Sequence, residues 1–274
     1  MKKISRAIIY FVFGILALTL TASLSHAQTQ DRPASWTLLE LSTLDIIEPE
    51  HPFQLFGEET DVYGLRLSLF YAKNKNIVGI DFGPLGVNSV TGDMTGIQIG
   101  AGANKSGDLK GIQVAGWSNL AEYDSSGIQV AGLVNEAADF RGLQLALGMN
   151  MISAGYNIKG IQISGLFNGA EALTGAQATA GINSCLKMEG LQVAGVSNFA
   201  LIMRGGQVAL GANNGEDITG VQVALIFNRA NNVKGAQVGL INYCRTLTGI
   251  QIGAINIVRD KKMLPVLPIV NASF

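Results

Sequence analysis

The chain has 274 residues, of which 48% are hydrophobic, only 14% are charged and 34 are glycines, and its formal net charge is −1. A disordered chain would carry more charge and less apolar content, so this class is excluded. Glycine does not recur at every third residue, which excludes a collagen-like chain. The composition therefore predicts an ordered chain that is unusually rich in glycine.

The N-terminal segment, residues 1–27, has the three-part pattern of a secretory signal peptide. A basic start, Met-Lys-Lys, precedes an apolar run over 7–20 and a small-x-small cleavage site that ends at Ala27. The alternative is an uncleaved membrane anchor, which would need about 20 apolar residues. We expect an exported protein of the periplasm, outer membrane or cell surface. Cleavage removes three basic residues, and the acidic chain that remains lacks a basic face for nucleic acid.

A five-residue motif, Gly-apolar-Gln-apolar-small, recurs along residues 96–253 at spacings of 14 to 18 residues, most often 15. With each motif glycine as position 0, glutamine lies at position 2, a small residue at position 4 and asparagine at position 8, or 7 in the last two copies. Weaker copies begin at Gly64 and Gly79. The eleven strong copies begin at Gly96, Gly111, Gly127, Gly142, Gly160, Gly175, Gly190, Gly205, Gly220, Gly235 and Gly249. Such self-similarity predicts about thirteen structural repeats.

Alternation of apolar residues with glutamine, together with many Val and Ile residues, predicts a short strand in each repeat. Polar residues usually precede the glycine, so we expect the chain to turn a corner there. This interpretation points the apolar residues at positions −2, 1 and 3 inward and the glutamine outward. Stacking would then align the asparagines in a ladder of hydrogen-bonded amides at a second corner, with a similar ladder of glutamines on the outer face. The fold class predicted is an all-β, parallel β-solenoid of about thirteen rungs.

The chain divides into four segments on this interpretation. After the signal peptide, residues 28–61 form a leader and N-terminal cap, 62–256 form the repeat domain, and 257–274 form a C-terminal cap. Caps are expected because the end coils of a stacked array have no outer neighbour. The alternative fold is a transmembrane β-barrel, which also has short strands, an export signal and often a terminal aromatic residue such as Phe274.

The head stretch from Gly64 to Asp81 is followed by repeated Gly-Ile-Gln-Val-Ala-Gly-x-x-Asn segments and by the ending Pro-Ile-Val-Asn-Ala-Ser-Phe. In these features the chain, over about residues 50–274, resembles the surface repeat-containing proteins of Gram-negative bacteria. The resemblance implies an exported, envelope-associated protein. It implies no activity and no functional residues.

The sequence offers no catalytic, cofactor-binding or metal-ligating residues. His51 is the single histidine of the exported chain, which leaves little for zinc binding or nucleophilic catalysis. Glu122, Glu171 and Glu216 share a repeat position but lie at least three rungs apart, so no close pair of acids is expected. We therefore expect a protein that is not an enzyme and has no cofactor.

Cys185 and Cys244 are the only cysteines of the chain. In a solenoid they would lie four rungs apart, or about 19 Å, which exceeds the ~7 Å between Cα atoms that a disulfide tolerates. No disulfide is expected between them.

The function expected is that of a non-catalytic scaffold or binding surface, exported to the envelope or cell surface. A glycan or an envelope protein is the expected partner of the repeated Gln and Asn display, and membrane association is left open. The first alternative is an outer-membrane β-barrel protein. The second is a carbohydrate-active solenoid enzyme, which would need clustered acids.

Overall fold

The computed structural model describes residues 36–43, 53–153 and 158–274, all of them in strands, turns and bends without a helix. The predicted signal peptide, residues 1–27, and residues 28–35 and 44–52 of the predicted leader and N-terminal cap lie outside the described residues. The strands are β1 (Trp36–Thr43), β2 (Phe53–Gln54), β3 (Asp61–Ser68), β4 (Tyr71–Asn74), β5 (Ile77–Gly83), β6 (Val87–Val90), β7 (Met94–Gly100), β8 (Ala103–Ser106), β9 (Leu109–Ala115), β10 (Ser118–Ala131), β11 (Val134–Ala146), β12 (Met149–Ile152), β13 (Ile158–Ser164), β14 (Phe167–Thr179), β15 (Ile182–Ala194), β16 (Ser197–Ala209), β17 (Ala212–Ala224), β18 (Phe227–Arg229), β19 (Asn232–Val238), β20 (Ile241–Cys244), β21 (Thr246–Val258) and β22 (Val266–Ser273).

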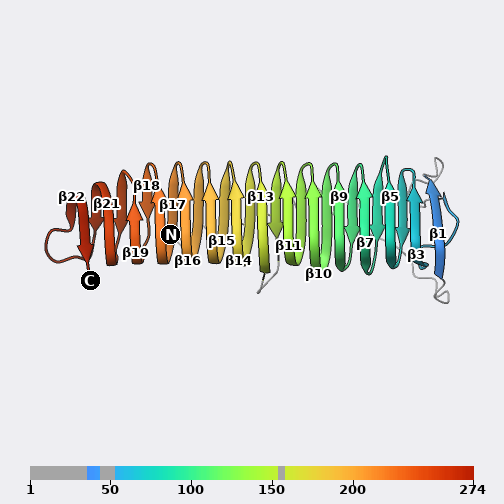
Figure 1. Cartoon of the computed structure of the whole chain (residues 1–274), viewed down its shortest axis with the longest axis horizontal. Coiled ribbons are helices and arrows are strands. Elements are labelled where there is room, and N and C mark those ends of the chain that lie inside the picture. Colours follow the sequence, from blue (N-terminus) through green and yellow to red (C-terminus); the bar gives the residue numbers. More distant parts are fainter. Residues whose placement is uncertain (1–35, 44–52, 154–157) are drawn as a thin grey trace. The chain divides into compact units, whose positions relative to one another are not determined.

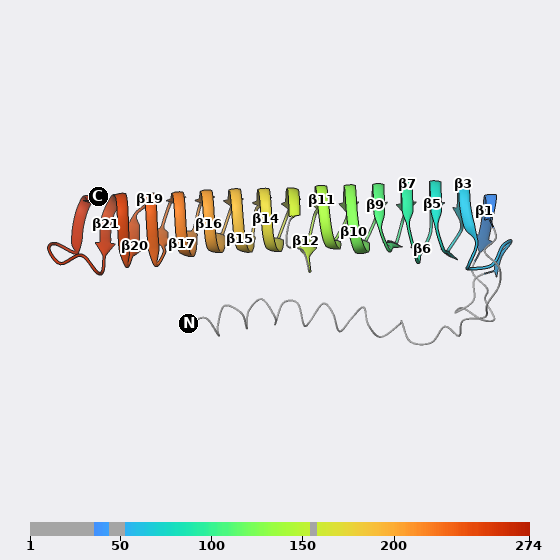
Figure 2. The same cartoon turned by 90° about the horizontal axis from the view of Figure 1, so that it is seen from below.

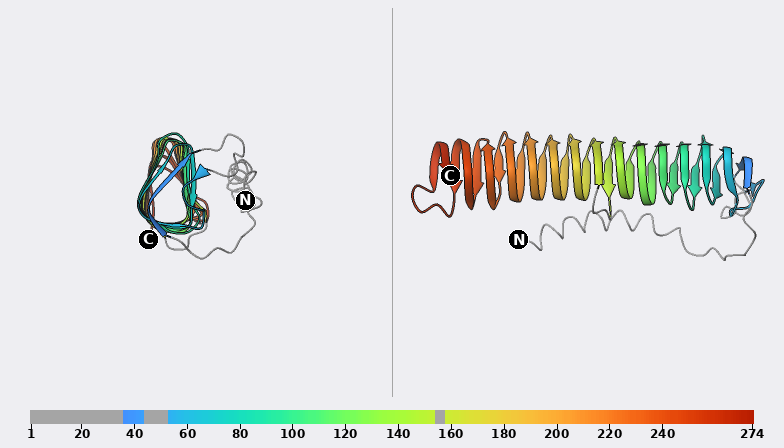
Figure 3. Two further views of the ribbon diagram at one scale, coloured as in Figure 1. Left: turned by 90° about the vertical axis from the view of Figure 1, so that its right-hand side faces the viewer. Right: turned by 60° about the horizontal axis from the view of Figure 1, so that its bottom comes forward.

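Successive coils of residues 36–274 stack in chain order from β1 to β22 (Figure 1; Figure 2). Neighbouring coils pair in parallel and in register, so that Asn183 of β15 lies beside Asn198 of β16 and Gly190 beside Gly205. The coils superimpose when the stack is viewed from its end (Figure 3). This arrangement confirms the predicted parallel β-solenoid of about thirteen turns. The alternative of a transmembrane β-barrel is wrong, because the repeats run in the same direction and enclose a packed interior.

One coil consists of a long strand, or two shorter ones, closed by a two-residue turn. In β17 the buried residues include Ile218, Gln222 and Ala224, at positions −2, 2 and 4 of the repeat, whereas Thr219 and Val221 are exposed. The strand thus alternates without interruption through its glycine, and the expectation that glutamine faces outward is wrong. The apolar residues at positions 1 and 3 face outward in its place.

The motif glycine makes this alternation possible. Gly220 has a φ of 137°, and all but one of the thirteen glycines at position 0 have φ between 130° and 148°. L-residues rarely adopt this conformation, whereas glycine does so without steric penalty. A Cβ atom on Gly220 would overlap the carbonyl oxygen of Gly205 in the preceding coil. Glycine therefore lets the backbones of successive coils approach closely at this point.

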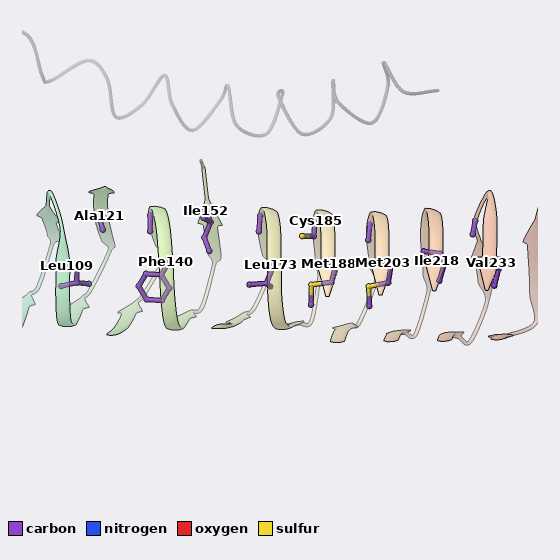
Figure 4. Packing of buried hydrophobic residues seen from close by; sticks show 14 of the residues in the cluster. Leu109, Ala121, Phe140, Ile152, Leu173, Cys185, Met188, Met203, Ile218 and Val233 are labelled. Carbon is purple, nitrogen blue, oxygen red and sulfur yellow. The ribbon is translucent and has the colours of Figure 1, made fainter. Parts of the chain in front are cut away.

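The apolar half of the interior is built from two columns of side chains. Position −2 supplies one column and position 10, or 9 near the C-terminus, supplies the other (Figure 4). Leu109, Phe140, Met188 and Met203 of the first column are at most 2% exposed. The second column includes Ala121, Ile152, Ala200 and both cysteines. Small residues here face larger ones across the narrow interior, which keeps the two sides of each coil close together.

Both ends of the stack are covered by strands without the motif. At the N-terminal end β1 pairs in parallel with β3, and the short β2 pairs with β1 in the antiparallel sense. At the C-terminal end β22 reverses direction and pairs antiparallel with β21. The antiparallel return places Asn271 beside Gln251 and buries it completely, so β22 covers the end of the interior.

We expect the change Ile269→Gly in β22 to stabilise the protein. Ile269 has a φ of 68° and lies opposite Gly253, next to a register shift between β21 and β22. This left-handed conformation costs a branched residue about 1–2 kcal/mol, and the side chain is 72% exposed, so little packing is lost. The free energy of unfolding, measured in urea, should rise by about 0.5–1 kcal/mol after the entropy cost of glycine. Val270→Gly is the control, and an equal rise in both variants would contradict the explanation by strain.

Candidate functional site

The polar half of the interior contains a ladder of glutamine side chains. Each Nε2 donates to the Oε1 atom of the preceding coil, from Gln113 donating to Gln98 through to Gln251 donating to Gln237, in ten hydrogen bonds of 2.7–2.9 Å. All eleven glutamines are at most 1% exposed. Because each amide has partners above and below, burial does not leave it unsatisfied within the column. Only the last acceptor, Oε1 of Gln251, has no partner.

A second ladder, of asparagines, runs along the inside of the two-residue turn, as predicted. Eleven hydrogen bonds of 2.8–3.1 Å connect Asn88 with Asn256, and each Nδ2 donates to the Oδ1 atom of the following coil. The same Nδ2 atoms also donate to main-chain carbonyls, for example from Asn183 to Val193 at 2.7 Å. The donors of the two ladders point in opposite directions along the axis, so their amide dipoles oppose one another.

The glutamine column ends in charged residues at its N-terminal end. Arg66 and Asp81 occupy position 2 of the two weak copies of the motif, and Glu40 of β1 lies beside Arg66. All three are completely buried. The guanidinium of Arg66 donates to both carboxylate oxygens of Asp81, at 2.7 and 2.6 Å, and Nε2 of Gln98 donates to Asp81 at 2.9 Å. The negative carboxylate of Asp81 thus accepts a hydrogen bond from the donor end of the amide column. This arrangement is favourable for the same reason that an acidic residue is favourable at a helix N-terminus.

Burial raises the pKa of Glu40, against the opposing effects of hydrogen bonds from the main chain of Phe56 and Leu55 and of the positive charge of Arg66. Its Oε1 atom accepts from the amide of Phe56 at 3.4 Å, and Oε2 has no partner. These charged residues stabilise the first coils of the stack, and they are closed to solvent, which makes them a structural element and not a binding site.

The outer face of the repeat strands carries the most extensive surface feature of the described residues. We define the apolar face as the side chains at positions 1 and 3 of the thirteen coils, from Leu65 and Leu67 to Ile250 and Ile252. Every position holds Ile, Leu, Val, Ala, Phe or, once, Gly, and none is polar or charged. Many are more than a third exposed, among them Ile161 at 46%. Monomeric proteins rarely leave so large a contiguous apolar surface uncovered, so the apolar face is our candidate binding site.

The apolar surface continues beyond the face itself. Leu39 and Leu41 of β1 align with Leu65 and Leu67 and are 43% and 42% exposed. The two-residue turns at positions 5 and 6 add further exposed side chains, which include Trp117, Leu147, Leu166, Leu210 and Leu225. The sequence did not predict the apolar face, because positions 1 and 3 were expected to point inward.

The structure also places two acids together that the sequence analysis did not pair. Asp124 of β10 lies beside Asp139 of β11. Burial, then the negative charge of Asp124 and a hydrogen bond between the two side chains, raise the pKa of Asp139. The coil that begins at Gly111 is one residue longer than most, and this extra residue brings the two acids to the same level. The irregular spacing is the signal that could have found them.

We expect Asp139→Asn to stabilise the protein at neutral pH. Because the folded state raises the pKa of Asp139, it binds this proton more readily than the unfolded chain, and wild-type stability falls as the pH rises through the raised pKa. Removing the repulsion should raise the free energy of unfolding at pH 7 by about 0.2–1 kcal/mol. The difference should shrink as the pH falls toward about 3, because Asp139 is then protonated in the wild type and no longer repels its neighbour. Urea titrations at both pH values test this, and Glu171→Gln, at an exposed acid, should show no such change.

The other residues considered in the sequence analysis remain apart. Glu122 forms an ion pair with Lys105 at 2.8 Å, Glu171 is exposed, and Glu216 lies three coils beyond Glu171. Among residues 36–43, 53–153 and 158–274, no group of three or more His, Cys, Asp or Glu side chains could hold a metal ion. No helix in the described part of the chain is long and apolar enough to cross a membrane.

Both cysteines are buried in the apolar half of the interior as free thiols. Burial raises the pKa of each to about 12. Cys185 and Cys244 are therefore protonated at neutral pH and are packing residues, because the thiolate is the reactive form of cysteine.

Comparison of the chain with models of protein families, with curated proteins and with solved structures finds no match. The resemblance to the surface repeat-containing proteins of Gram-negative bacteria stays a prediction.

Proposed function

We propose that the chain is a non-catalytic protein, exported to the cell envelope or surface, that acts as a scaffold with the apolar face as its binding surface. The observation that carries this proposal is the outward-facing positions 1 and 3 of thirteen coils, none of which holds a polar or charged residue. Exposed apolar surface of this extent marks an interaction site. The N-terminal pattern of a basic start, apolar run and small-x-small site supports export.

The chemistry of the apolar face favours a protein over a glycan as the partner. The glutamines and asparagines that could have contacted a glycan bond to one another in the interior and are closed to solvent. Positions 1 and 3 present no hydrogen-bonding side chain for sugar hydroxyls. The partner that fits the apolar face therefore presents an apolar surface of its own, as a protein does.

Expression in a Gram-negative host tests both parts of this proposal. Mass spectrometry of the exported chain should find an N-terminus at Gln28, and chemical cross-linking of intact cells should give an adduct larger than one chain. A variant with Val193→Glu and Val208→Glu places charge on the apolar face and should lose the adduct. The control, Ser184→Glu with Asn214→Glu, places the same charge at position 9 of the repeat, outside the apolar face, and should keep the adduct. An uncleaved chain in the cytoplasm, or an adduct that survives the face variant, would contradict the proposal.

A further inference from the structure

We propose that the apolar face binds a second copy of this chain, so that two solenoids pack face to face about a twofold axis. This inference rests on the proposed function, since it names the partner of the same surface. Three properties of the face carry it: its area, its straightness and its lack of charge.

The area of the face suits a stable dimer. Thirteen coils spaced by about 4.8 Å give a length of about 60 Å, and the three residues from positions 1 to 3 span about 10 Å. Two such faces would bury about 1,200 Å² in total, which is at the lower end of the range for a specific protein–protein interface. The exposed side chains of the adjoining turns, such as Leu166 and Leu225, lie outside this estimate.

The strands beneath the face form a straight stack. Viewed from the end, the coils superimpose without the rotation that neighbouring strands of an open sheet accumulate (Figure 3). The two internal amide ladders hold the coils in this register. A straight stack presents straight rows of apolar side chains, and an identical face can pack against these rows, as two sheets do at about 10 Å in a β-sandwich.

The composition of the face suits a second copy, and a lipid surface is the competing occupant. Protein segments that lie on membranes carry Trp or Tyr at the interface and basic residues toward the headgroups. Positions 1 and 3 hold one aromatic residue, Phe82, and no charged residue, whereas the outward-facing position −1 at the edge of the face carries the exposed basic residues Lys110, Arg141, Lys159, Arg204 and Lys234. A surface without charge of either sign is complementary to itself, which is what a twofold interface requires.

The test measures the mass of the purified exported chain in solution by sedimentation equilibrium. We expect a dimer at micromolar concentration. Val193→Glu with Val208→Glu should weaken the dimer by about 100-fold or more, because the twofold axis places four uncompensated carboxylates in one apolar interface. Ser184→Glu with Asn214→Glu should dimerise like the wild type. Circular dichroism and urea unfolding of both variants check that the fold is retained, since all four side chains point outward.

Three outcomes would overturn the inference. The first is a monomer at every concentration up to about 100 µM, which is far above the Kd of a standard specific interface. The second is a dimer that the face variant does not weaken, and the third is a monomer that binds vesicles of phosphatidylethanolamine and phosphatidylglycerol through the face. The proposed function would survive the first and third outcomes if cross-linking in cells still gave an adduct that the face variant removes. The proposed function would fail, and the dimer would stand, if the purified chain were a dimer but the protein were not exported.

Discussion

Gly190→Ala is expected to destabilise the centre of the solenoid by about 4 kcal/mol, from strain in the main chain and overpacking against the neighbouring coil. Gly190 has a φ of 138°, and an added Cβ atom would overlap the carbonyl oxygen of Gly175. The obstacle is main chain held on both sides by parallel pairing, so it cannot move aside like a flexible side chain. Relief of the overlap must separate the coils that begin at Gly175 and Gly190 and stretch the hydrogen bond from Gln192 to Gln177.

Gly206→Ala is the matched control, because Gly206 lies next to a motif glycine but at position 1, where two other strong copies hold alanine. A Cβ atom there would meet only the flexible end of Leu191, at 3.2 Å. We expect a change in stability within about 0.5 kcal/mol. Hydrogen exchange followed by mass spectrometry should show faster exchange in coils 175–205 of the Gly190 variant alone, since a repeat array weakens locally at a poor interface. Equal exchange in both variants would refute the proposed clash.

The period and direction of the solenoid were predictable because they follow from spacing alone. A motif that returns every fifteen residues with its asparagine in constant phase can be satisfied by stacking in register, and the asparagine ladder formed where it was expected. The orientation of the strand was not predictable from alternation, because a period of two defines two faces without saying which is inside. Hydropathy favoured the face with positions 1 and 3 as the inner one, which is wrong.

Hydropathy failed for the glutamines because it scores residues one at a time. A single buried amide leaves donors and acceptors unsatisfied, which is costly. A column of amides, each bonded to the next, satisfies them collectively, and Gln177 therefore costs little when Gln162 and Gln192 flank it. The apolar residues at positions 1 and 3 then remain outside. The candidate site was missed for the same reason, since its residues were assigned to the core.

Arg66→Met should have the other large effect, a loss of about 3–5 kcal/mol in the stability of the N-terminal coils, the usual cost of removing one member of a buried ion pair. The change leaves Asp81 and Glu40 buried without their shared cation. It also removes the hydrogen bonds from Arg66 to Asn74 and to the carbonyl of Ser89. Hydrogen exchange should accelerate over residues 61–83 and remain unchanged over 182–209, because coils contact only their neighbours.

The dependence on pH separates loss of charge from loss of packing. The pKa of Glu40 is already raised by burial, and the loss of Arg66 removes the positive charge that opposes this shift. A raised pKa means that stability falls as the pH rises through it, so the deficit of the variant should be large at pH 7 and should shrink below the ordinary value of 4.5. The double variant Arg66→Gln with Asp81→Gln extends the amide column by two neutral residues and should recover most of the lost stability at pH 7. A deficit independent of pH, with no recovery in the double variant, would mean that the bulk of the arginine matters and not its charge.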